Sequence, residues 1–301
     1  DAAVMMPRGS ADVRGEQLAV LESECHALLT SPKVSRLLDR AQANEAQLED
    51  WQRANLREMR RERDHAIATP LSLITRLAKA TSHAEVRWLE AKQQNSFAIF
   101  APHLEEVVAL TRDKAAVLSQ ALGLSPYDSL IDGFSPGFLS EHIDQLFRAA
   151  GRRLPGLIRE VIELQGARPP LPIAGKVGIS KQRALAVDVM RKMGFPFDRG
   201  RLDESDHPST EGVAGDVRVT TRFDLTDPFT GLMGVLHETG QAMYDLGLPE
   251  AWRDQPVGRD RGMALEESQS LLLEMLIGRS RAFLTYLRPL LEKHYGAVGP
   301  E

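Results

Sequence analysis

The residues whose types could carry chemistry stand together in His237-Glu238-Thr239-Gly240-Gln241. This run is one residue away from H-E-x-x-H, in which two imidazoles on one helix face bind zinc and the intervening Glu is the general base. Here His237 and Glu238 are present, and Gln241 stands at the second ligand position. A Gln offers only a neutral carbonyl oxygen, a weaker zinc donor than imidazole. The run therefore predicts a metal-binding helix with one altered ligand.

A third metal ligand must come from another part of the chain. Glu267 lies in Glu266-Glu267-Ser268-Gln269-Ser270, at the start of an apolar segment. Carboxylates are rarely buried without a partner, so Glu267 is the candidate ligand. The alternative is an exposed carboxylate that only stabilises a helix start. We expect His237, Gln241 and Glu267 to hold a divalent cation, with Glu238 as general base on the water that the cation binds.

The helix that carries this motif can be delimited from the sequence. Asp227-Pro228 is a helix-start signal, and Gly247 followed by Pro249 marks the end. Gly240 inside this helix costs roughly 1 kcal/mol relative to Ala. That cost suggests that another backbone approaches closely at Gly240.

Two neighbouring elements complete the expected surroundings of the motif. Residues 216–223 alternate strictly, with Val217 and Val219 on one face and Arg218 on the other, which predicts a strand. A second helix is expected from about residue 262 to residue 277. Because that segment is apolar on nearly all sides, we expect the helix to be buried.

The rest of the chain indicates a mainly α protein. Residues 1–130 read as long amphipathic helices with breaks at Ser31-Pro32 and Thr69-Pro70. Residues 131–301 form a further helical part that contains the strand and the motif helix. The whole is interpreted as a single, incomplete domain. Arginines in residues 57–64 alternate with acidic residues, which favours a solvated helix face over a nucleic-acid site.

Composition excludes several classes of partner and points to a compartment. The net charge is −5 and the pI is near 6.0, so neither nucleic acid nor an anionic membrane is expected to bind. No apolar run approaches the ~18–20 residues of a membrane span. The single cysteine, Cys25, rules out an internal disulfide and favours the cytoplasm. The chain starts at Asp1 rather than Met, which suggests a fragment of a longer protein.

Several blocks occur along the chain in a fixed order. They are Met5–Ser10, His207-Pro208-Ser209-Thr210, Asp216-Val217-Arg218-Val219-Thr220-Thr221-Arg222-Phe223, His237–Tyr244 and Glu266–Ser270. The last four resemble the H-P-F-T, D-x-R-I-T-T-R-Y, H-E-x-G-H-A-x-Y and H-E-S-Q-S blocks of the carboxypeptidase Taq family of metallocarboxypeptidases. The first also resembles a family segment, one near the beginning of the protein. The resemblance covers nearly the whole chain, and the order and spacing of the blocks make it specific.

The resemblance implies a fold and an activity. The fold is a helical two-lobed groove of the zincin-like kind, with a small β-sheet next to the metal-site helix. The activity is metal-dependent hydrolysis of C-terminal amino acids from peptides, by homodimers that use Zn²⁺ or another divalent cation such as Co²⁺ or Mn²⁺. Carried over, His237, Gln241 and Glu267 occupy the metal positions and Glu238 is the general base.

The resemblance also suggests substrate contacts. His207, Arg218 and Arg222 are candidates to bind or polarise the peptide, whose backbone is expected to pair with the edge of strand 216–223. The alternatives are surface ion pairs for the two arginines and a turn role for His207 before Pro208. Family blocks that bind the substrate carboxylate would lie after residue 301.

Two departures from the family pattern leave a second function open. Gln241 and Glu266 both stand where the family has His. Losing a nitrogen ligand weakens metal binding, and Glu266 adds negative charge without restoring the bond. The alternative is therefore a catalytically impaired homologue or fragment that acts as a peptide-binding or assembly module. A plain helical scaffold with a coincidental motif is a third explanation, which the ordered blocks disfavour.

Overall fold

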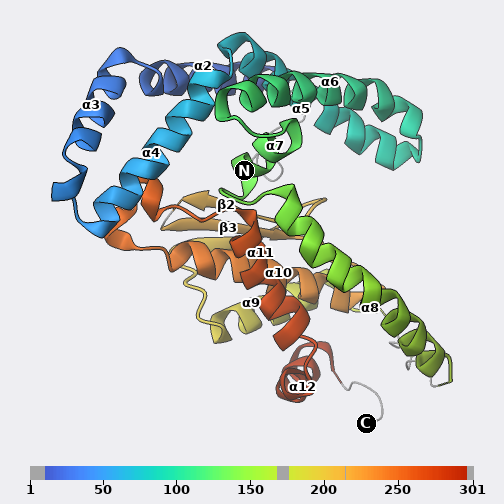
Figure 1. Cartoon of the computed structure of the whole chain (residues 1–301). Coiled ribbons are helices and arrows are strands. Elements are labelled where there is room, and N and C mark those ends of the chain that lie inside the picture. The colour runs from blue at the N-terminus through green and yellow to red at the C-terminus, as the bar shows by residue number, and fades with distance from the viewer. Residues whose placement is uncertain (1–10, 168–175, 214, 297–301) are drawn as a thin grey trace. The chain divides into compact units, whose positions relative to one another are not determined.

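The computed structural model describes residues 11–167, 176–213 and 215–296 (Figure 1). The family-like block Met5–Ser10 lies outside these residues. The described chain forms two compact units, one of residues 11–142 with 254–257 and one of residues 143–253 with 258–296. The division falls in the first turn of α8 (Ser140–Ala167), whereas the sequence indicated a change near residue 130.

The first unit is entirely helical in its described residues. Ser31 and Ser125 open two of its helices by accepting hydrogen bonds from backbone N–H groups, and Pro follows each Ser. Its core lies between the two longest helices, where Leu73, Ala80 and Leu110 are buried. Its elements are α2 (Ala11–Leu29), α3 (Pro32–Ala43), η2 (Glu45–Gln47), α4 (Asp50–Ala68), α5 (Leu71–Gln94), α6 (Phe97–Leu122) and α7 (Pro126–Phe134).

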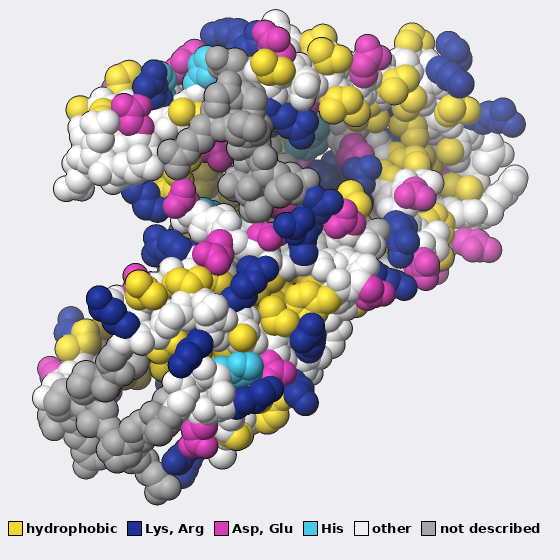
Figure 2. Space-filling view, turned by 180° about the vertical axis from the view of Figure 1, so that it is seen from behind, with side chains coloured by type: hydrophobic (Ala, Val, Ile, Leu, Met, Phe, Trp, Pro, Cys, Tyr) yellow, Lys and Arg dark blue, Asp and Glu magenta, His cyan; other side chains and the backbone are white. Residues whose placement is uncertain are grey.

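The charged run on α4 behaves as the mixed signs predicted. Arg61 lies 3.2 Å from Glu58, and Arg60 lies 3.2 Å from Asp39 on α3. On the face shown in Figure 2, Lys and Arg side chains are likewise interspersed with Asp and Glu. The described helices include none long and apolar enough to cross a membrane.

The second unit surrounds a small sheet with helices. Its elements are most of α8, α9 (Ile179–Lys192), β1 (Gly200–Glu204), β2 (Ser209–Val213), β3 (Asp216–Thr221), α10 (Pro228–Leu246), η3 (Glu250–Trp252), η4 (Pro256–Gly258, at the boundary between the units), α11 (Met263–Leu271), the π-helical η5 (Leu272–Ile277) and α12 (Arg281–Tyr295). One core cluster joins α9, α10 and the sheet, and a second joins α9, α10 and α12. The mainly α class, with a small sheet beside the helix that carries His237, is confirmed.

The predicted strand is β3, and it is the centre of the sheet. Val217 and Val219 are buried against α9 and α10, as the alternation predicted. The strand order is β1-β3-β2, with β1 parallel and β2 antiparallel to β3. Both edges of β3 are therefore already hydrogen-bonded, and the expectation that a peptide pairs with β3 is wrong. Pairing depends on distant segments, so the local pattern could not reveal it.

The helix that carries the motif matches its predicted limits. The Asp227 side chain accepts the backbone N–H of Thr230 at 3.2 Å, Pro228 is the first helical residue, and Gly247 caps the end of α10. Ten residues of α10 are buried, which anchors the helix firmly between the sheet, α9 and α12.

The following helix differs from its prediction in burial. Its limits agree, since α11 and η5 together run from Met263 to Ile277. However, Leu272 and Ile277 are each 42% exposed and Leu276 is 70% exposed, so the expected burial is wrong. An apolar composition shows that a segment can be buried but not which of its faces finds a partner.

Candidate active site

The site is built where α10 and α11 cross. A Cβ added to Gly240 would lie 2.6 Å from the Ser270 Cα and 2.9 Å from the Gln269 carbonyl oxygen. These are backbone atoms and cannot rotate away. Only glycine permits this approach, which is the contact that the internal Gly240 suggested. The crossing brings side chains one turn apart on α10 opposite α11.

Three side chains converge on the carboxylate of Glu267. The His237 Nε2 lies 3.3 Å from its Oε2, and the Gln241 Nε2 donates to its Oε1 at 3.1 Å. The hydroxyl of the fully buried Ser270 donates to Oε2 at 3.1 Å. The structure therefore brings together His237, Gln241 and Glu267, the three residues that the sequence singled out as metal positions.

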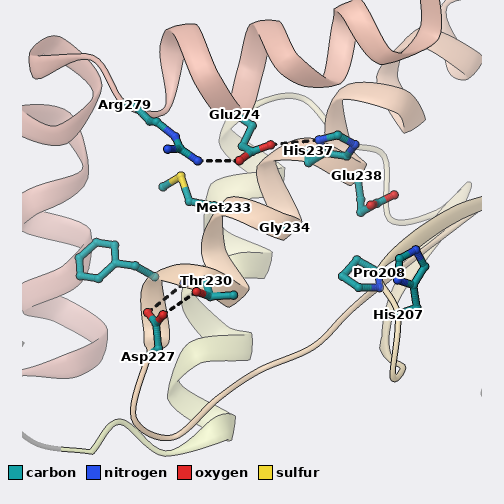
Figure 3. Close-up of a pocket in the computed structure, with 11 residues that line it drawn as sticks. His207, Pro208, Asp227, Thr230, Met233, Gly234, His237, Glu238, Glu274 and Arg279 are labelled. Atoms are coloured by element: carbon teal, nitrogen blue, oxygen red, sulfur yellow. Dashed lines mark hydrogen bonds and ion pairs between the residues drawn. The ribbon is translucent and has the colours of Figure 1, made fainter. Parts of the chain in front are cut away.

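The other nitrogen of the His237 ring faces a second carboxylate. Its Nδ1 lies 3.1 Å from the Oε2 of Glu274 in η5, and the Arg279 guanidinium donates to the remaining Oε1 at 2.8 Å. Figure 3 shows Glu274 between His237 and Arg279. The imidazole is thus held between two carboxylates, one on each side of its ring.

Glu238 is buried and held by the sheet. Its side chain is 5% exposed, and the Thr210 hydroxyl in β2 lies 2.8 Å from its Oε2 and 2.9 Å from its own carbonyl oxygen. Burial raises the pKa of Glu238, while the hydrogen bond from Thr210 and the charge of His237 act in the opposite direction. A carboxylate with a raised pKa and a fixed orientation has the properties of a general base.

Of these groups, His237, Glu238, Glu274 and Arg279 line a pocket of about 650 Å³ (Figure 3), whereas Gln241 and Glu267 are not among its lining residues. His207, His237 and Glu238 lie at its lining together with the apolar Phe229 and Met233. The volume lies within the ~300–1,000 Å³ typical of ligand sites. The lining therefore offers both apolar and ionisable contacts to a ligand.

Two of the expected substrate residues do not line this pocket. Arg218 forms a 2.8 Å ion pair with Asp216, and Arg222 is exposed beyond the end of β3. The ion pair fits the surface role that was the alternative for Arg218. A substrate role for either arginine stays a prediction.

The donor atoms around Glu267 can be compared with the requirements of a divalent cation. Among the described residues no three His, Cys, Asp or Glu side chains are grouped to hold one, so Gln241 would be the third protein donor beside His237 and Glu267. Donors about 2.0–2.1 Å from a tetrahedral ion lie roughly 3.3 Å apart, close to the separations found around Glu267. Turning the Gln241 amide would point its carbonyl oxygen at that carboxylate, which a cation between them would favour. One nitrogen and two oxygen donors fit such an ion, with less preference for zinc than a second imidazole gives.

The Gln241 side of the site is crowded with acidic groups. Burial, followed by repulsion from Asp245 and Asp260, raises the pKa of Glu266 to about 7. Burial and repulsion from Asp260 raise the pKa of Asp245 to about 6. Negative charge is therefore in excess beside Glu267, which favours a cation there.

Four residues of the site were not singled out from the sequence. Thr210 and Ser270 lay inside blocks that were recognised, but their contacts cross between elements. Glu274 is the only charged residue in the run Leu271–Ile277, and that isolation was a usable signal. Arg279 had none, because its pairing depends on the turn after η5.

The family model and the curated relatives that match this chain are all described as carboxypeptidases. A family model described as Carboxypeptidase Taq (M32) metallopeptidase matches residues 1–300. Thermostable carboxypeptidase 1 from Thermus thermophilus is 33% identical over 310 residues, covering 99% of this chain and 61% of that protein. Carboxypeptidase 1 from Bacillus subtilis is 30% identical over 287 residues, covering 95% of this chain and 57% of that protein.

Solved structures of related proteins also superpose on nearly the whole chain, which again covers about 60% of each of them. Metallocarboxypeptidase 1 from Trypanosoma cruzi superposes with a TM-score of 0.89 at 38% identity, over 99% of this chain and 60% of that one. An M32 carboxypeptidase from Deinococcus radiodurans gives 0.84 at 29% identity, over 99% and 60%. The chain thus spans about three-fifths of the length of these relatives.

Proposed function

Because this chain belongs to the carboxypeptidase Taq (M32) family of metallopeptidases, we propose that its pocket is the site of a metal-dependent carboxypeptidase. The substrates would be peptides, from which the site releases C-terminal amino acids. The observation that carries the proposal is that His237 and Gln241 contact the carboxylate of Glu267 at 3.3 and 3.1 Å, beside the buried Glu238.

The residues divide the work of hydrolysis between them. A divalent cation, Zn²⁺ or a harder ion such as Co²⁺ or Mn²⁺, would polarise the scissile carbonyl and activate water, with His237, Glu267 and the Gln241 carbonyl as its ligands. Glu238 accepts the proton of the attacking water and passes it to the leaving amine. Thr210 keeps the carboxylate of Glu238 directed to one side of α10. His207, at the pocket lining, is proposed to contact the peptide.

Release of the C-terminal residue from an N-blocked dipeptide tests this proposal. The chain is assayed with added Zn²⁺, Co²⁺ or Mn²⁺, beside the variants Glu238→Gln and Glu250→Gln. Removing a general base lowers the rate about 10²–10⁴-fold, so Glu238→Gln should lose turnover. Glu250 is exposed in η3, and Glu250→Gln should retain it. Absence of turnover with every ion would contradict the proposal.

One observation favours a second candidate function. The Gln241 N–H already satisfies Glu267, so the cluster is complete without a cation. A catalytically impaired homologue that binds peptides or assembles with another subunit would have this arrangement. Binding of the blocked dipeptide that is equally tight with and without a chelator, and without turnover, would favour this function. Homodimeric assembly and a cytoplasmic location stay predictions.

A further inference from the structure

We propose that Glu274, held in turn by Arg279, is a positioning residue that fixes the ring orientation of His237, with Nδ1 as the hydrogen-bond donor to Glu274. The proposal concerns how the imidazole is presented to Glu267 and to a cation, and its effect on metal binding rests on the function proposed above. Its effect on the ring itself does not depend on that function.

Both carboxylate oxygens of Glu274 have a hydrogen-bond partner. One accepts from the His237 ring at 3.1 Å, and the other accepts from Arg279 at 2.8 Å. The Glu274 side chain is 18% exposed and that of His237 is 20% exposed, so water competes little for these bonds. With both oxygens bound, the carboxylate has one orientation in which all of its partners are satisfied.

This arrangement sets which nitrogen of the imidazole donates to Glu274. A carboxylate facing Nδ1 requires a proton there, because a lone pair at Nδ1 would repel it. With Nδ1 as the donor to Glu274, Nε2 is the nitrogen that faces Glu267 and that a cation held there would bind. Carboxylate partners on the far nitrogen of a ligating His fix the ring and raise its basicity in the same way.

The backbone shows why Glu274 reaches His237. The Gly278 N–H donates to the Leu273 carbonyl at 2.7 Å, which closes a π turn instead of an α turn. A Cβ on Gly278 would lie 2.7 Å from the Leu236 Cδ1, so glycine lets η5 approach α10 beside His237. Single π turns inside α-helices often occur at functional sites.

The burial pattern of η5 argues against a merely structural salt bridge. Within this segment Leu276 is 70% exposed and Met275 is 44% exposed, while the Glu274 side chain is turned inward. Burying a carboxylate while apolar neighbours stay in water opposes the hydrophobic effect. The inward position of Glu274 beside exposed apolar residues therefore supports a functional role for its carboxylate at His237.

The first test measures the ring without any metal. Histidine labelled with ¹⁵N reports the protonation of each ring nitrogen, and the His237 signals are those missing in His237→Gln. We expect a protonated Nδ1 in the unsubstituted chain and a partly deprotonated Nδ1 in Glu274→Gln. The matched control is Glu292→Gln on α12, which removes the same charge from an exposed pair with Arg288 and should change nothing. An unchanged His237 signal in Glu274→Gln would overturn the proposal.

The second test measures affinity for Zn²⁺ and Mn²⁺ by competition with a chelator. Loss of such a partner lowers metal affinity about 10–100-fold, which we expect for Glu274→Gln. Arg279→Met should lose less, because Glu274 keeps its contact with the ring. If Glu274→Gln does not fold, Arg279→Met carries both tests, and unchanged Nδ1 protonation and affinity in it overturn the proposal. If the unsubstituted chain binds neither ion, the function proposed above fails, while the ¹⁵N signals still decide the role of Glu274.

Discussion

The site has two ends on α10, one at His237 and one at Gln241, and the charges around these two residues differ. At the His237 end, the carboxylate of Glu274 forms an ion pair with Arg279 on one side and contacts the imidazole on the other. At the Gln241 end, Glu267 receives only neutral donors, and Glu266 and Asp245 nearby hold protons more tightly than usual. Both ends lie within one turn of a single, well-anchored helix.

The difference shows where the site is short of positive charge. The family pattern has His at positions 241 and 266, and this chain has a neutral amide and an acid instead. The groups that orient the first imidazole are in place, whereas position 241 offers an amide and not a second imidazole to a cation. A divalent cation would restore the balance, so changes at the Gln241 end should have the largest effects.

The largest effect is expected when Gln241 is replaced by His. A second imidazole supplies the missing nitrogen donor, and zinc affinity should rise by at least about 100-fold, beyond the range measured for partners of ligands. Competition with a chelator and the zinc-dependent rise in melting temperature measure the change. Gln94→His, at the exposed end of α5, is the control. Equal zinc affinity in Gln241→His and the unsubstituted chain would refute the claim that this end lacks only a donor.

A second prediction concerns the crossing of α10 and α11 at Gly240, which holds both ends of the site in place. Gly240→Ala should destabilise the chain by about 1–3 kcal/mol through overpacking against the Ser270 backbone, despite the better helix propensity of Ala. Gly156 on α8 has no atom within 4 Å of an added Cβ, so Gly156→Ala should stabilise by about 0.5–1 kcal/mol. Unfolding in denaturant gives both values. Equal effects of the two substitutions would show that the helices are not held together at Gly240.

A third prediction concerns the hydroxyl that holds Glu238. Thr210→Val removes this donor and should cost about 1 kcal/mol, the low end for a buried acceptor, because Glu238 can take up a proton instead. Thr210→Ser keeps the hydroxyl and should be close to the unsubstituted chain. Thermal unfolding of both variants checks the difference, and equal losses would assign the effect to the methyl group.

The smallest effect is a pH dependence at the acidic end. A pKa raised to about 6 for Asp245 and about 7 for Glu266 means that the folded state binds these protons more tightly than the unfolded state. The contribution of these two groups to folding stability is therefore fully present below about pH 4, and it is lost as the pH rises through 6 and 7.

Removing one of these acids tests the sign. Asp245→Asn should raise the melting temperature at pH 8 by about 1 °C, since partial exposure screens the repulsion, and should change little at pH 4. The exposed Asp198 serves as control through Asp198→Asn. A gain of equal size at both pH values would exclude repulsion as the cause.

The sequence predicted those features that depend on neighbouring residues. The cap at Asp227-Pro228, the end at Gly247 and the faces of β3 all follow local rules and were found. The close approach at Gly240 was also foreseen, because an unfavourable residue inside a helix needs a reason. Bringing Glu267 to His237 depended on block order and on the family resemblance rather than on periodicity.

What the sequence did not predict depends on distant pairing. The central place of β3 requires β1 and β2 to choose their partner, and the exposure of Leu276 reflects which neighbours η5 has. The contacts of Thr210 and Glu274 join elements that are far apart along the chain. Each of these outcomes is a tertiary contact that overrides the local pattern.

The π turn in Leu272–Ile277 also sets a rule for the length of this segment. Each residue of an α-helix rotates the chain by about 100°, and a π turn contains one residue more than an α turn. Deleting one residue here would let the helix become regular and would swing every later side chain around the axis. Arg279 would then point away from Glu274. The exposed residues of this segment can therefore be substituted without moving Arg279, whereas a change in their number would break its pairing with Glu274.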